Sequence, residues 1–202
     1  MNRREALQQV AWLMGGAISA PALLGLLNGC TAKQAVGWKP VLLTDEQGAL
    51  VAEVAEIMIP RTDTPGAKDV GIPSFIDLML KDAYPKEDQA RFIAGLKQFD
   101  AQAHEQYGRG FMQLDPAQRS ALVQTANDSA VAAERSNPGT AALPRPFVLM
   151  TKELTLLGYF TSQVGATRVL QYNPVPGVFR GCVPLSEAGN GKTWAVETST
   201  RF

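Results

Sequence analysis

The side chains of this sequence that could perform chemistry are few and lie far apart. The single histidine is His104. Arg61 and Asp63 lie two residues apart in the stretch IPRTDTPGAKDVGIPSF, residues 59–75. A guanidinium and a carboxylate at this spacing could bind an anion or orient a polar substrate. One hypothesis is therefore an enzyme that uses Arg61, Asp63 and His104 as substrate-binding and acid/base groups.

The same residues have a structural interpretation, which we favour. An aspartate in a turn commonly accepts hydrogen bonds from its own downstream backbone, and Arg61 would then cover helix ends or pair with Asp63. His104 lies beside Glu105 on the polar side of an expected helix, where a lone histidine is usually only an exposed side chain. Prolines 60, 65 and 73 stiffen the stretch, so we expect a strut between two helices rather than a linker.

The common signatures of cofactor and metal sites are missing. The sequence has no Cys-x-x-Cys-His for haem, no paired Cys/His set for zinc and no Gly-x-Ser-x-Gly. No glycine-rich loop follows an expected strand, and the acidic residues are scattered singly. We therefore expect no catalytic residue, no cofactor and no metal in this chain. The 19 basic and 19 acidic residues form no block of one sign, so a nucleic-acid partner is not expected.

The N-terminal residues 1–29 are typical of an export signal. Arg3 and Arg4 precede an uncharged stretch over residues 10–27, which resembles a twin-arginine signal and predicts a periplasmic protein. The alternative is a membrane anchor, but glycines and a proline dilute the apolar run. The twin-arginine route carries folded proteins, which suits a chain that travels bound to a cofactor-containing partner.

The two cysteines have separate interpretations. Leu27-Asn28-Gly29-Cys30 resembles a lipobox, which predicts a diacylated Cys30 and attachment to the membrane through the lipid. The alternative is an ordinary cysteine near a cleavage site. Cys182 would then be an odd thiol in an oxidising compartment, and we favour a disulfide to a partner chain. A buried thiol and a Cys30–Cys182 bridge remain alternatives.

The apolar periodicity predicts a single all-α domain over residues 44–202, preceded by a tether over 31–43. A capping box at Thr44 opens the first helix, which Pro60 ends. Further helices are expected after Pro73, after Pro85 and from Asp115 to about Asn127. A last helix, apolar on more than one side, begins at residue 147, breaks near Gly165 and should be central. The expected fold is a small bundle of about five helices.

The sequence changes character from residue 172 onward. It becomes rich in proline and glycine and loses helical periodicity, yet it keeps large apolar side chains. We therefore expect a long extended, non-helical C-terminal arm, residues 172–202, that packs on this domain or on another chain. Its expected contact residues are Tyr172, Pro174, Pro176, Phe179 and Trp194.

Two long stretches carry a family resemblance. EIMIPRTDTPGAKDVGIPSFID (residues 56–77) and TLLGYFTSQVGATRVLQYNPVPGVFRGCVPL (residues 155–185) resemble the gluconate 2-dehydrogenase subunit 3 family. The resemblance implies a non-catalytic small subunit that binds, stabilises and co-exports a flavoprotein of the glucose-methanol-choline type, in which FAD resides. It further implies electron transfer from the flavin to a cytochrome c subunit or a soluble carrier. The alternative above becomes a stand-alone lipoprotein that oxidises a sugar.

The resemblance also implies that the two stretches form part of the interface with the partner. The motif stretch contributes Arg61, Asp63 and Pro65 to the expected partner interface, and the second stretch contributes Tyr159 and Phe160 beside the residues of the arm. No catalytic residue carries over.

Overall fold

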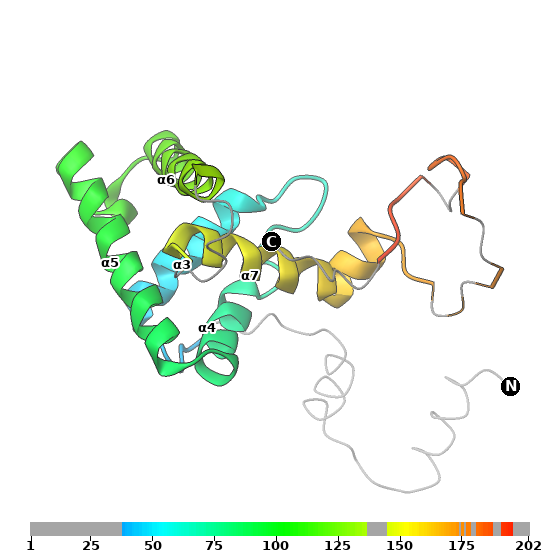
Figure 1. Cartoon of the computed structure of the whole chain (residues 1–202), viewed down its shortest axis with the longest axis horizontal. Helices are drawn as coiled ribbons and strands as arrows, with labels where there is room; N and C mark the ends of the chain where they lie inside the picture. Colours follow the sequence, from blue (N-terminus) through cyan, green and yellow to red (C-terminus); the bar gives the residue numbers. More distant parts are fainter. Residues whose placement is uncertain are drawn as a thin grey trace, which may run out of the picture. The chain divides into compact units, whose positions relative to one another are not determined.

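The computed structural model describes residues 38–136, 145–173, 175, 177–178, 181–187 and 191–195 (Figure 1). Within these residues the fold is helical and contains no β-strand, which confirms the all-α prediction. The helices are α3 (Asp45–Met58), α4 (Ile72–Ala83), α5 (Lys86–Tyr107), α6 (Pro116–Ser136) and α7 (Phe147–Thr161), with a 3-10 helix at Phe111–Gln113 and a π-helix at Gly165–Val169.

Side-chain caps fix where two of the helices begin. Thr44 Oγ1 accepts from the Gln47 backbone N–H at 3.2 Å, and Gln47 Oε1 accepts from the Thr44 N–H at 3.0 Å. This is the predicted capping box of α3. Asp115 and Gln118 exchange the same pair of bonds at the start of α6. Local sequence therefore sets both starts.

Helix α6 ends later in the sequence than predicted. The helix continues past Asn127 to Ser136. Its second half is held by tertiary packing, because Ala130 forms a small apolar cluster with Val148 and Leu149 of α7. The apolar period is weak beyond Asn127, and the partner that stabilises this part lies on another helix.

Helix α7 is the central element, as its apolar pattern predicted. It contacts α3, α4, α5 and α6. The ring of Phe147 packs against Phe92 and Phe99 with centroid separations of 5.0 and 5.6 Å. At the other end of α7, a Cβ on Gly158 would lie 2.5 Å from a ring carbon of Phe75, so α4 packs closely there.

A buried carboxylate fastens the segment before α3 to α4. Asp77 is fully buried, and its oxygens accept from the backbone N–H groups of Val41 (2.6 Å), Leu42 (3.2 Å) and Leu43 (2.8 Å). Part of the segment expected as a tether is thus bound to the domain. The sequence signal for Asp77 was its inward position on the α4 stripe of Pro73, Ile76 and Leu80.

The helical part of the chain ends in two steps. Helix α7 stops at Thr161, slightly before the expected break near Gly165, and the π-helix Gly165–Val169 follows. No described residue beyond Val169 is helical. The long extended arm stays a prediction, since residues 174, 176, 179–180, 188–190 and 196–202 lie outside the described part.

Candidate partner-binding surface

The loop that joins α3 to α4, residues 59–71, is held by a polar network. Glu56 on α3 accepts from the backbone N–H groups of Arg61 (3.2 Å) and Lys68 (2.8 Å). Asp69 accepts from Arg61 Nε at 2.6 Å and from the Gly66 N–H at 3.0 Å. The Arg61 hydrogen bond holds the pKa of Asp69 below its usual range, against a smaller opposing effect of burial.

The geometry corrects one expectation about this loop. Arg61 pairs with Asp69 rather than with Asp63, because the turn folds Asp69 back onto the guanidinium. Asp63 is exposed at the loop tip, where the Thr62 hydroxyl donates to it at 2.9 Å. The loop joins two helices and is held in place by this network, as expected. We call residues 59–71 the strut.

Tyr159 is placed differently from its expected role in a partner interface. It is only 1% exposed, and its hydroxyl donates to the Pro65 carbonyl oxygen at 2.6 Å. Phe160 packs edge-on against the Tyr159 ring at a centroid separation of 5.4 Å and is half-buried. Tyr159 therefore joins α7 to the strut inside the domain, and a partner cannot reach it.

A second ionic group ties the strut to α6. Glu53 on α3 pairs with Lys68 of the strut and with Arg119 of α6, the latter at 3.0 Å. Burial would raise the pKa of Glu53, but Lys68 and Arg119 together hold that pKa below its ordinary value. Lys68 and Arg119 thus share one carboxylate, which ties α3, the strut and α6 together.

The three residues of the enzyme hypothesis are not assembled into one site. Arg61 bonds Asp69, Asp63 bonds Thr62, and the His104 ring lies 3.9 Å from the Asp100 carboxylate on α5. Each of the three thus has a partner outside the set, and the described residues contain no cluster of His, Cys, Asp and Glu suited to a metal ion.

The stretch from Gln171 to Ala195 carries the exposed apolar side chains. We call residues 171–195 the C-terminal loop, because an isolated parallel bridge joins Gln171 to Trp194. Six of the ten exposed large hydrophobic side chains of the described residues lie in this loop. Their exposed fractions are Tyr172 62%, Val175 77%, Val178 86%, Val183 39%, Leu185 55% and Trp194 39%.

The other predicted residues of the arm are only partly described. Cys182 is an exposed free thiol. Pro174, Pro176 and Phe179 lie outside the described residues, as do Arg3, Arg4 and Cys30 of the expected signal and lipobox. No helix within the described ranges has the length and apolar character needed to cross a bilayer.

A groove of about 820 Å³ lies between α5, α6 and the start of α7. Arg145 at its edge pairs with Glu134 and, at 2.7 Å, with Glu153. Burial raises the pKa of Glu153 although Arg145 opposes it. Both arginines that line the groove are thus paired within the domain, Arg145 with these two carboxylates and Arg91 with Asp88. The C-terminal loop is the stronger candidate for a functional surface.

Comparison with known proteins concerns most of the described domain. The family model described as Gluconate 2-dehydrogenase subunit 3 matches residues 45–177, which is more than half of the chain. The match runs from the first residue of α3 into the C-terminal loop and includes the strut. No curated protein and no solved structure matches the chain.

Proposed function

The chain belongs to the gluconate 2-dehydrogenase subunit 3 family, and from this membership we propose that it is a non-catalytic subunit that binds and stabilises a flavin-dependent catalytic subunit. The family consists of subunits of a dehydrogenase complex, so association with the catalytic part of such a complex follows from membership. The finer proposal is that the partner is a flavoprotein of the glucose-methanol-choline type. FAD resides in that partner, and this chain contributes no cofactor.

The observation that carries the proposal is the exposed apolar side chains of the C-terminal loop. A packed core lies beside a loop whose tyrosine, tryptophan and aliphatic side chains face solvent. Fully burying one large apolar side chain contributes roughly 1.5–3 kcal/mol. Several such contacts, less the cost of ordering the loop and its partner, are enough for a lasting interface.

The route to the membrane forms part of the same proposal. Arg3 and Arg4 direct the folded chain, with the flavoprotein bound to it, through twin-arginine export into the periplasm. Acylation of Cys30 attaches the complex to the membrane, and Cys182 forms a disulfide with the partner. A cytochrome c subunit or a soluble carrier accepts the electrons of the flavin.

Co-purification tests the interface. The full chain and a variant that lacks residues 172–202 are each co-expressed with a flavoprotein of the glucose-methanol-choline type, and the flavin absorbance that elutes with the tagged chain is measured. We expect flavin with the full chain and none with the shortened chain. Leu78→Ala with Leu157→Ala is the matched control, since both side chains are exposed outside the C-terminal loop and their loss should leave the yield of flavin unchanged.

Two results would overturn the proposal. Flavin that still elutes with the shortened chain would place the interface elsewhere. Reduction of a dye by the purified chain alone, in the presence of a sugar, would replace the accessory role with the enzyme hypothesis built on Arg61, Asp63 and His104.

A further inference from the structure

The C-terminal loop is joined to the core through a defined turn. The Ser162 hydroxyl donates to the Tyr159 carbonyl at 2.6 Å and accepts from the Gly165 N–H at 3.0 Å. A Cβ on Gly165 would lie 1.9 Å from the Tyr159 carbonyl oxygen, so only glycine fits there. The Leu170 N–H then bonds to the Gly165 carbonyl at 2.8 Å and completes the π-helix, a feature often found at functional sites.

The two ends of the C-terminal loop are tied together at this point. The Gln171 N–H donates to the Thr193 carbonyl at 2.9 Å, and the Ala195 N–H donates to the Gln171 carbonyl at 2.8 Å. The Gln171 side chain donates to the Lys192 carbonyl, and Lys192 Nζ donates to the Arg168 carbonyl. We call these four hydrogen bonds between residues 168–171 and 192–195 the clasp.

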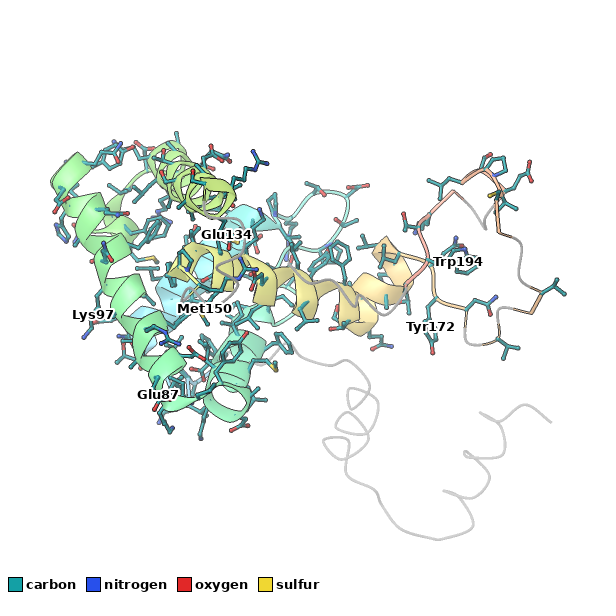
Figure 2. All side chains as sticks on the ribbon, in the orientation of Figure 1. Glu87, Lys97, Glu134, Met150, Tyr172 and Trp194 are labelled. Carbon is teal, nitrogen blue, oxygen red and sulfur yellow. The ribbon has the colours of Figure 1, made fainter. Side chains whose placement is uncertain are left out.

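The clasp brings distant apolar side chains to the base of the loop. Tyr172 follows directly after the bridged Gln171, and Trp194 is the other bridged residue. Figure 2 shows both aromatic side chains at this base, which lies beyond the end of α7 in Figure 1. An open segment would have to bring these residues together when it bound, at an entropic cost that grows with the length of the loop.

From this geometry we propose that the clasp preorganises the C-terminal loop, so that the loop docks onto the flavoprotein as a closed unit. The inference rests on the proposed function and adds how its interface is presented. Closing the loop before binding lowers the entropy lost in the complex, which raises affinity without adding a contact. Gln171, Lys192 and Ala195 are thus positioning residues, and the apolar side chains make the contacts.

The chemistry of the loop favours a protein surface over a lipid surface. Residues 171–195 contain the charged residues Arg180, Glu187 and Lys192 and no cluster of basic residues. Adsorption to an anionic membrane depends on several lysines or arginines beside the apolar groups. An apolar region of the flavoprotein matches this composition better.

Proline substitution tests the clasp because it removes one N–H and no apolar side chain. Ala195→Pro deletes the donor to the Gln171 carbonyl, and Ala195→Ser is the matched control that keeps it. We expect Ala195→Pro to weaken binding to the flavoprotein by about tenfold, the cost of reordering a few side chains, and Ala195→Ser to bind like the parent chain. The melting temperature of the domain should not change in either variant. Gln171→Pro, which deletes both the backbone donor to Thr193 and the side-chain donor to Lys192, is a second variant, and we expect it to weaken binding at least as much.

Hydrogen exchange on the free full-length chain provides a direct measurement of the clasp. We expect the Gln171 and Ala195 amides to be protected in the parent chain and the Ala195→Ser variant, and the Gln171 amide to lose protection in Ala195→Pro. Fast exchange of both amides in the free parent chain would overturn the inference. Parent-like affinity of both proline variants would also overturn it.

Two further experiments distinguish a failure of the clasp from a failure of the proposed interface. If Tyr172→Ala with Trp194→Ala loses the flavoprotein while both proline variants keep it, the interface stands and the clasp does not. If none of these variants loses the flavoprotein, the interface itself is wrong. Sedimentation of the parent chain with vesicles of anionic phospholipid, lost in Ala195→Pro, would identify a membrane as the ligand instead.

Discussion

The strut and the C-terminal loop have similar compositions but opposite relations to the core. Both are rich in proline and glycine, and none of their described residues is helical. In the strut, backbone groups are paired with Glu56 and Asp69, and the Tyr159 hydroxyl fastens Pro65. In the C-terminal loop, the described residues show hydrogen bonds at the base and six exposed large apolar side chains.

Segments of similar composition can therefore have two different roles, support of their own domain or binding of another molecule. A loop whose polar groups are satisfied by its own domain supports that domain, since removing any partner leaves an unpaired group. A loop with exposed apolar side chains leaves binding energy available for another molecule. Changes in the strut should therefore lower stability, whereas changes in the C-terminal loop should lower binding.

The largest expected effect is on binding through the C-terminal loop. Replacing Tyr172 and Trp194 together by alanine should weaken association with the flavoprotein by about 2–4 kcal/mol, because buried aromatic side chains dominate interface energies. The melting temperature should stay constant, since both side chains are exposed. Calorimetric titration and thermal unfolding measure the two quantities. A fall in melting temperature with unchanged affinity would reverse the roles assigned to the two loops.

A pair of glycine substitutions compares the loops directly. A Cβ on Gly66 would lie 2.2 Å from a Glu56 carboxylate oxygen and 2.8 Å from the Arg61 nitrogen. Gly66→Ala should therefore lower the free energy of unfolding by about 2–3 kcal/mol, because Glu56 cannot move without releasing its backbone partners. A Cβ on Gly177 would meet no atom within 4 Å, so Gly177→Ala should cost only the roughly 1–2 kcal/mol of placing alanine at a φ of 71°.

Chemical denaturation of the two glycine variants measures these two losses in the free energy of unfolding. Equal losses of stability in both would mean that the C-terminal loop belongs to the cooperative core.

A single hydroxyl gives a smaller effect. Tyr159→Phe removes the donor to the Pro65 carbonyl, and we expect a loss of about 1 kcal/mol in the free energy of unfolding. Tyr172→Phe is the matched control, since this tyrosine is 62% exposed, and its stability should match that of the parent chain. Urea denaturation measures both. An unchanged Tyr159→Phe variant would show that the strut does not depend on this bond.

The smallest expected effect is a pH dependence from the strut. The folded-state pKa of Asp69 is lowered by the Arg61 hydrogen bond. A depressed carboxyl pKa stabilises the fold above the unfolded-state pKa, and this contribution is lost as the pH falls through the folded-state pKa. Asp69→Asn should flatten the acid limb of a plot of melting temperature against pH. A parallel curve for the variant would argue against the ion pair.

The starts of the helices were predictable from the sequence because their signals are local. The caps at Thr44 and Asp115 act over three residues, and the apolar stripe of α5 repeats within one helix. The end of α6 was not predictable, because its second half is held by packing against Val148 and Leu149 of α7. Side-chain roles that depend on a distant partner were also missed.

The candidate surface also combines features that the local sequence predicted with features that depend on tertiary packing. The sequence placed Tyr172 and Trp194 in an apolar segment without helical period that packs on this domain or on another chain, and the structure shows that both side chains are exposed on the domain. The burial of Tyr159 did not follow, because its position is fixed by a hydrogen bond to Pro65, 94 residues earlier. The neighbouring Tyr159 and Phe160 are both aromatic, and only the tertiary structure shows that Tyr159 is buried and Phe160 half-buried.

The sequence by itself determined the helical class, the central place of α7 and the apolar character of the C-terminal loop, because each depends on spacing within a few residues. The tertiary structure alone decided that Arg61 pairs with Asp69 and that Asp77 fastens residues 41–43. It also decided that Gln171 meets Trp194 at the clasp. Hydrogen bonds and ion pairs act over about 3 Å, and the chain must fold before residues distant in sequence come within that range.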